Sequence, residues 1–135
     1  MVIVDSTTWI DYLRDLDNPQ TRWLDREVAL QAIGLTDLIL CEVLRGVRRD
    51  ENADAVLGKL QAFTIHSTGG EDLAIASAEN YRNLRAKGYT VRKTIDCIIA
   101  TFCIQSGFSL LHNDRDFDPF ENLLGLKVIH PERFQ

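Results

Sequence analysis

Apolar positions along the chain fall into two patterns that alternate: short runs rich in β-branched residues, and stripes at helical spacing. The runs are typical of short buried strands. They lie within residues 2–4, 28–35, 63–65, 109–112 and 126–129. Between them, spacings of three and four residues predict amphipathic helices. Strands that alternate with helices predict an α/β sandwich with a mostly parallel central sheet flanked by helices, whose ligands bind at the carboxyl ends of the strands.

Capping residues indicate where several of these helices begin. Asn18-Pro19 is a capping residue followed by proline at the first helical position. Thr36 and Thr94 are the expected caps of two later helices. The first helix follows the strand at residues 2–4 directly, and three hydroxyl residues are available to cap it. These are Ser6, Thr7 and Thr8.

The clearest helical pattern spans residues 70–87, with Gly88 as the expected residue after its end. The apolar stripe of this helix consists of Leu73, Ala74, Ala78, Tyr81 and Leu84. Ile75 falls off the stripe, so we expect it to be exposed or to meet a partner. Residues 50–60 also read as a helix, whereas the polar, acidic residues 113–119 read as a loop.

The composition is that of a single domain that covers residues 1–135. Apolar residues make up 45% of the chain, which is enough for a core without disulfides. The first residues have no basic region before an apolar run, and no segment reaches about 20 uninterrupted apolar residues, so we expect neither a signal peptide nor a membrane span. Cys41, Cys97 and Cys103 each lie in an apolar-rich stretch, which predicts buried, reduced thiols in a cytoplasmic protein.

The formal net charge of −5 argues against non-specific binding of nucleic acid, which usually needs a basic surface. It does not exclude an enzyme that acts on RNA. Carboxylates gathered around a metal ion make the net charge more negative, and the ion reverses the local sign of the charge. Nucleic acid therefore stays open as a substrate if a divalent cation is present.

Several carboxylates occupy positions that point to such a cation. Asp5 ends the first strand, and Asp114 follows a later strand after one residue, so parallel strands would bring both to the same edge of the sheet. Asp96 lies in the first turn of its helix. Glu42 lies mid-helix among apolar neighbours, where a carboxylate is costly unless it is paired or bound to a cation. Mg²⁺ and Mn²⁺ prefer such oxygen ligands, and they activate water and stabilise charge on a phosphodiester.

Each acid also has a purely structural interpretation. Asp5 could end a strand or cap a helix, and Asp96 could complement the helix macrodipole. Asp114 and Asp116 could be ordinary turn residues, and Glu42 could pair with the arginine three residues later. Taken one at a time, these interpretations compete on equal terms with a metal site.

Other chemistries lack the residues that they need. The histidines His66, His112 and His130 follow no zinc spacing, and there is no Gly-rich phosphate loop. A phosphatase that forms an aspartyl phosphate would need a second Asp where Thr7 stands. A response-regulator receiver would need an acidic pair at the first strand, where only Asp5 is found.

Four segments together resemble a known family over nearly the full chain. They are the residues VIVDSTTWI at 2–10, CEVLRG at 41–46, TIDCIIA at 94–100 and LLHNDRDF at 110–117. In this order and spacing they resemble the PIN-domain toxins of bacterial type II toxin–antitoxin pairs, the VapC-like ribonucleases. The resemblance implies a PIN fold, an Mg²⁺- or Mn²⁺-dependent endoribonuclease and structured RNA such as tRNA or rRNA as substrate. It also implies a homodimer and a small VapB-like antitoxin whose tail covers the acidic pocket.

Carried over residue by residue, the resemblance assigns the family's four acids to Asp5, Glu42, Asp96 and Asp114 as the catalytic and metal-binding set. Asp116 matches a fifth, less constant acid. The resemblance also suggests that Ser6 or Thr7 orients Asp5. Many relatives have Ser or Thr two residues before the fourth acid, and His112 stands there in this chain.

Positive residues lie near these motifs at Arg45, Arg48, Arg49, Arg92, Lys93 and Arg115. We expect some of them to contact RNA phosphates, and the three assigned to this role are Arg92, Lys93 and Arg115. Plain surface charge explains each of them equally well. The large aromatic side chains are expected in the core or an interface rather than as stacking platforms for bases, and Trp9 is a candidate for a dimer or antitoxin surface. The rival function is a catalytically inactive PIN-like module that acts through a protein partner, whose usual mark would be a missing acid.

Overall fold

The computed structural model describes residues 1–134, which form one α/β sandwich around a parallel sheet of five strands. The strands are β1 (Val2–Val4), β2 (Ile33–Thr36), β3 (Thr64–His66), β4 (Ser109–Leu111) and β5 (Lys127–Val128). Their order across the sheet is β3-β2-β1-β4-β5, and every pair is parallel. The predicted fold class is therefore confirmed. The order reverses between β1 and β4, which pair with Val4 opposite Leu111.

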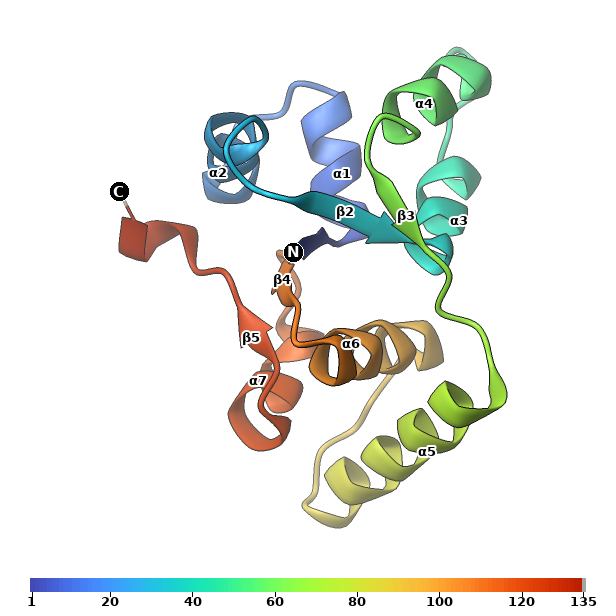
Figure 1. Cartoon of the computed structure of the whole chain (residues 1–135), viewed down its shortest axis with the longest axis vertical. Helices are drawn as coiled ribbons and strands as arrows, with labels where there is room; N and C mark the ends of the chain where they lie inside the picture. Colours follow the sequence, from blue (N-terminus) through green and yellow to red (C-terminus); the bar gives the residue numbers. More distant parts are fainter. Residues whose placement is uncertain (135) are drawn as a thin grey trace.

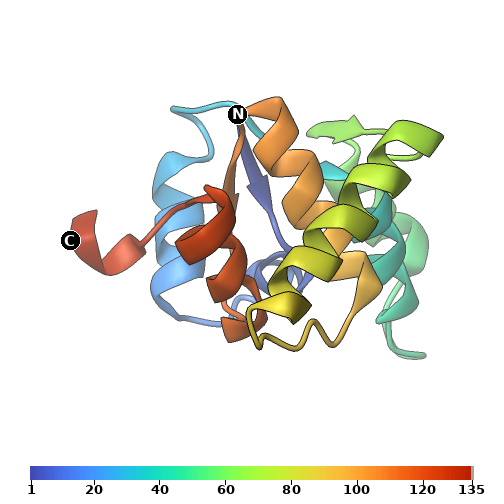
Figure 2. The same ribbon diagram turned by 90° about the horizontal axis from the view of Figure 1, so that it is seen from below.

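Two helical layers cover the sheet (Figure 1). One consists of α1 (Ser6–Leu13), α2 (Pro19–Glu27), α3 (Asp37–Arg45) and α4 (Ala53–Leu60). The other consists of α5 (Glu71–Ala86), α6 (Thr94–Ser106) and α7 (Asp118–Leu124), and Figure 2 shows these three from below. Short 3₁₀ helices span Arg115–Phe117 (η1) and Pro131–Phe134 (η2). Within residues 1–134, no helix is long and apolar enough to cross a membrane.

Two of the predicted helix caps are confirmed, and two are wrong. The Asn18 side chain accepts a hydrogen bond from the backbone N–H of Thr21 in a full capping box, and Thr36 caps α3. Thr94 is instead the first residue of α6, and Lys93 occupies its N-cap position. The N-cap position of α1 belongs to Asp5 and not to Ser6, Thr7 or Thr8, because the chain turns into the helix directly after β1.

The aromatic residue proposed for a partner surface lies in the core. Trp9 is fully buried, and its ring packs against Phe63 with 4.8 Å between the ring centroids. It therefore neither stacks on bases nor forms an interface, and packing was the right interpretation. Trp23 is buried as well.

The cysteine prediction is correct for two of the three residues. Cys97 and Cys103 are buried, and burial raises the pKa of the Cys103 thiol to about 12. Cys41 is exposed. The buried positions of α3 are Ile39 and Val43, two residues to either side of Cys41, so helical geometry turns Cys41 away from the sheet.

The predicted stripe of α5 is partly wrong. Its buried residues are Leu73, Ser77 and Leu84, whereas the two alanines at positions 74 and 78 are exposed. The helix packs on α6 through a partly polar face, in which the amide of Asn80 donates to the hydroxyl of Thr101 at 3.0 Å. Apolar spacing alone could not identify a buried serine as part of this face.

The predicted loop at residues 113–119 is also wrong. The chain there forms η1 and then begins α7, a helix that the apolar pattern did not indicate. The Asp114 carboxylate accepts a hydrogen bond from the backbone N–H of Asp116 at 2.9 Å, which starts the 3₁₀ turn. Pro119 then lies in the first turn of α7, where its missing N–H costs no hydrogen bond.

Candidate active site

The candidate site lies at the carboxyl ends of β1 and β4, where the strand order reverses. Asp5 follows β1, and its backbone N–H donates to the carbonyl of Leu111 at the end of β4 at 2.9 Å. Asp114 follows β4 after His112 and Asn113. The expectation that Asp5 and Asp114 share one edge of the sheet is therefore correct. Such a reversal point is where open parallel sheets bind their ligands.

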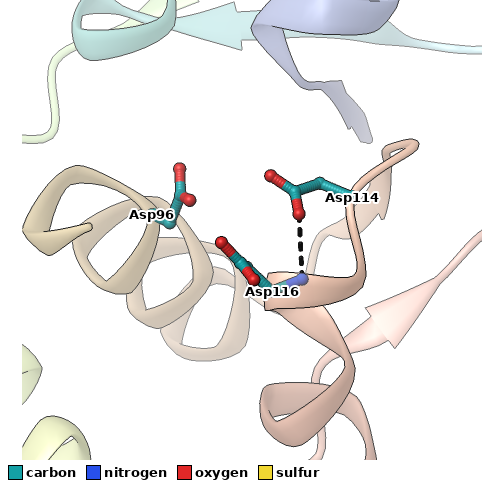
Figure 3. A group of neighbouring side chains, drawn as sticks. All are labelled: Asp96, Asp114 and Asp116. Carbon is teal, nitrogen blue, oxygen red and sulfur yellow. Dashed lines mark hydrogen bonds between the residues drawn. The ribbon is translucent and has the colours of Figure 1, made fainter. Parts of the chain in front are cut away.

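Three carboxylates converge at this edge, as Figure 3 shows. Asp96 lies on α6, Asp114 lies directly before η1 and Asp116 lies in η1. Each offers a carboxylate oxygen, and these oxygens all lie within 4.8 Å of one another. The hydrogen bond from the Asp116 backbone to Asp114 fixes these two relative to each other. Asp116, which the resemblance made the least constant acid, is thus part of the most compact group.

Asp5 and Glu42 stand outside this compact group but are close enough to interact with it electrostatically. The negative charges of Asp96, Glu42 and Asp114 all contribute to raising the pKa of Asp5. Within residues 1–134, no ion pair joins Glu42 to Arg45, so the structural interpretation of Glu42 is not the one the fold adopts. All five predicted acids therefore belong to one electrostatic neighbourhood.

Burial is the main cause of the raised pKa values of two acids in this pocket. Together with the neighbouring carboxylates, it raises the pKa of Asp5 from 3.8 to about 7 and that of Asp96 from 3.8 to about 6. The backbone N–H of Ser6 opposes the shift at Asp5, and the ammonium group of Lys93 opposes it at Asp96. The pocket therefore has an excess of negative charge that nearby protein groups offset only in part.

Several carboxylate oxygens in the pocket have no partner. Asp5 Oδ1, Glu42 Oε1 and Asp96 Oδ2 are buried and accept no hydrogen bond from the described chain. Buried oxygens are normally satisfied, and a divalent cation in the pocket would offer a partner to carboxylate oxygens of this kind. The donor set is all oxygen, which fits Mg²⁺ or Mn²⁺ rather than zinc.

His112, the departure from the family pattern, holds the backbone of Asp114. Its Nδ1 accepts a hydrogen bond from the Asp114 N–H at 3.0 Å, and its ring packs on Phe117. Burial lowers the pKa of His112, so the ring stays neutral and Nδ1 stays an acceptor. Sequence reasoning missed this role. The available signal was an acceptor side chain two residues before an acid that ends a strand.

The three cations flanking the motifs lie beside the acids. Arg92, Lys93 and Arg115 are exposed and line an open cleft of about 780 Å³, together with Asp114 and Asp116. The Nζ atom of Lys93 lies 4.0 Å from Asp114 Oδ2. The cleft thus joins a cationic rim to the acidic pocket.

Other parts of the site were predicted less completely. Residues 128–132 form a further wall of the cleft that sequence reasoning missed. Within this wall, His130 Nε2 forms a hydrogen bond with Glu121 Oε2 at 2.7 Å. Ser6 is half-buried and Thr7 is exposed. Their role in orienting Asp5 stays a prediction.

Comparison with known proteins gives consistent sequence matches. The PIN domain pattern matches residues 2–122 of the chain. Over 133 residues the chain is 31% identical to VapC ribonuclease Mb1587 of Mycobacterium bovis, an alignment that covers 95% of this chain and 97% of the relative. The identity and both coverages are the same for Ribonuclease VapC11 of Mycobacterium tuberculosis.

Several solved structures share the fold of this chain. FitAcB from Neisseria gonorrhoeae matches with a TM-score of 0.76 at 20% identity, over 98% of this chain and 99% of that chain. VapBC2 from Rickettsia felis, bound to a DNA fragment from its promoter, matches with a TM-score of 0.72 at 16% identity, over 96% and 98%. Because the family pattern spans most of its length and relatives share 31% identity across it, the chain belongs to the PIN domain family and, within it, to the VapC-type ribonucleases.

Proposed function

We propose that this protein is an Mg²⁺- or Mn²⁺-dependent endoribonuclease and the toxin of a VapBC-like toxin–antitoxin pair. The observation that carries the proposal is the set of buried, unpartnered carboxylate oxygens at the reversal point of the sheet, beside a cationic cleft. Such a pocket is costly to the fold unless it binds a cation. The relatives that share the sequence pattern carry the name ribonuclease.

Each residue of the pocket has a part in this proposal. Asp5, Glu42, Asp96 and Asp114 would hold the cation, and Asp116 would add a further oxygen on the side of η1. A divalent ion, when bound, lowers the pKa of water and stabilises charge on a phosphodiester. The β1 and α6 backbones keep two of these carboxylates in place before RNA arrives.

The cleft supplies the other half of the proposal. Arg92, Lys93 and Arg115 bind backbone phosphates and hold the RNA strand against the acidic pocket. Contacts of this kind recognise a phosphate backbone rather than a base sequence. We take structured RNA, such as tRNA or rRNA, as the substrate class because of the VapC resemblance.

The proposed partners follow from the same family. The matching solved structures include VapBC and FitAB assemblies, and we propose a small VapB-like antitoxin for this chain, together with a homodimeric state and a cytoplasmic location. A cationic side chain of such an antitoxin would find its complement in the acidic pocket. The inactive binding module is the alternative, but its mark is a missing acid, and all five acids are present at the site.

A cleavage assay on total cellular RNA tests the proposal. We expect the wild type to release discrete fragments only when Mg²⁺ or Mn²⁺ is present. The activity of Asp96→Asn should fall at least about 100-fold, because the loss of a metal ligand weakens the stabilisation of charge on the phosphodiester. Asp72→Asn, an exposed acid on α5, serves as the matched control and should cleave normally.

Two results would contradict the proposal. A folded Asp96→Asn variant with full activity would reject the assignment of the site. If neither protein cleaves RNA, although both are folded, supplied with metal and free of copurified antitoxin, the inactive binding module becomes the better function.

A further inference from the structure

Lys93 stands apart from the other cations of the cleft through one contact. Among the ion pairs of residues 1–134, only that of Lys93 reaches the acidic pocket, with Nζ 4.0 Å from Asp114 Oδ2. Arg92, its neighbour in sequence, lines the same cleft but makes no such contact. The two residues therefore have similar exposure and charge and differ in their reach to the acids.

The position of Lys93 brings its charge to two acids at once. It occupies the N-cap position of α6, three residues before Asp96, in an extended backbone conformation. Its side chain reaches Asp114, while its charge also favours the ionised form of Asp96. The ammonium group thus lies near two members of the compact carboxylate group that fits a divalent ion.

The side chain is free to leave this position. It is 61% exposed, whereas the Asp114 side chain is 28% exposed. An exposed lysine pair is held weakly and is screened by salt. Lys93 can therefore lie over the pocket when the carboxylates need a counter-charge, and move away when another cation supplies it.

We propose that Lys93 is the internal counter-cation of the acidic pocket, which competes with the divalent metal for the carboxylates and thereby lowers the affinity of the pocket for metal. This inference rests on the proposed function, since it requires that the pocket binds a metal. Once a metal is bound, like charges repel, and the ammonium group is released toward the cleft, where RNA phosphates would take it. Lys93 would thus neutralise the carboxylates before metal binds and contact RNA phosphates afterwards.

Binding of Mn²⁺, followed by isothermal titration calorimetry, tests the proposal without reference to RNA cleavage. The titrations are made at about pH 8, where protons compete least for the carboxylates. We expect Lys93→Met to bind Mn²⁺ roughly three- to tenfold more tightly than the wild type. The substitution removes a unit positive charge that lies 4.0 Å from the Asp114 carboxylate, one of the proposed metal ligands. Lys93→Arg keeps the charge and should bind as the wild type does.

Arg92→Met is the matched control, since it removes a neighbouring charge that does not contact the acids. It should leave Mn²⁺ affinity unchanged. The advantage of Lys93→Met should shrink between about 50 mM and about 500 mM NaCl, because the interaction is electrostatic and exposed. Circular dichroism of each variant shows that the fold is retained.

The outcomes separate this inference from the proposed function. If Mn²⁺ binds the wild type and Asp96→Asn abolishes binding, but Lys93→Met equals the wild type or Arg92→Met matches Lys93→Met, only the competition is rejected. If no variant binds Mn²⁺ at either salt concentration, the metal site itself is rejected, and the competition with it.

Discussion

At Asp5 and Asp96, the demands of folding and of metal binding oppose each other. Metal binding needs both carboxylates ionised, but burial favours their protonated forms and raises their pKa values to about 7 and about 6. In the unfolded chain these groups ionise near 3.8. Between the unfolded pKa of 3.8 and the folded pKa values of about 6 and about 7, the folded protein therefore binds more protons than the unfolded chain. The stability that protonation provides is complete below about pH 4 and is lost as the pH rises through the folded pKa values.

Removal of the Asp5 carboxylate should therefore stabilise the metal-free protein at high pH. In the metal-free protein, Asp5→Asn removes the cost of a buried charge, so it should raise the melting temperature by several degrees at about pH 8 and much less at about pH 5. Thermal unfolding by circular dichroism in EDTA measures both shifts. Equal shifts at the two pH values would show that the Asp5 carboxyl does not carry the pH dependence.

Single residues differ in how far the sequence alone could place them. Asp5 was placed correctly, because it ends an apolar run and the end of a strand is a local property. His112 could be noticed as a departure, but its hydrogen bond to the Asp114 backbone depends on the turn that follows β4. For Trp9 the sequence left both the core and a partner surface open, because its neighbour Phe63 lies far away in the sequence.

At the scale of elements, helix starts were predicted well where side chains cap them, and buried faces less well. Asn18 and Thr36 act on backbone groups three residues away, so their effect can be read from adjacent residues. The buried face of α5 is set instead by its contact with α6, which buries Ser77 and leaves Ala74 and Ala78 exposed. The buried face of α5 therefore depends on α6, a helix that begins only after α5 has ended.

The close approach of β2 and β3 gives the second prediction. Gly34 pairs with Thr64, and a Cβ added at Gly34 would lie 2.8 Å from the Thr64 carbonyl oxygen, a backbone atom that cannot turn away. We expect Gly34→Ala to lower the free energy of unfolding by about 1–3 kcal/mol, as overpacking does. Urea denaturation measures the change.

Gly58 provides the control for this experiment. It lies in α4 with no atom within 4 Å of an added Cβ, so Gly58→Ala should stabilise the protein by about 0.5–1 kcal/mol through helix propensity. If both alanine variants shift stability in the same direction, the contact with Thr64 is not what requires glycine in β2.

For the whole molecule, metal binding should reverse the instability of the acidic pocket. The proposed Mg²⁺ or Mn²⁺ site exists only in the folded protein. The ion should therefore raise the melting temperature at about pH 8 and do so far less at about pH 5, where protons occupy Asp5 and Asp96. Differential scanning fluorimetry measures this shift, with NaCl of equal ionic strength as the control. Asp96→Asn should remove it, and an undiminished shift in that variant would place the metal elsewhere.

Local features of the sequence predicted the alternation of strands and helices, the caps at Asn18 and Thr36, and the acids that end strands or begin helices. Periodicity and capping depend on residues a few positions apart, so they survive without knowledge of the fold. The resemblance to the PIN family added which acids belong together.

How closely these acids approach one another, and what surrounds them, depends on the packing of distant parts of the chain. Asp96 and Asp116 lie on separate elements, and their meeting within 4.8 Å depends on how α6 packs beside β4. The exposure of Cys41, the burial of Ser77 and the reach of Lys93 to Asp114 have the same origin. Each depends on the packing of elements against one another, which brings together residues that no local pattern in the chain connects.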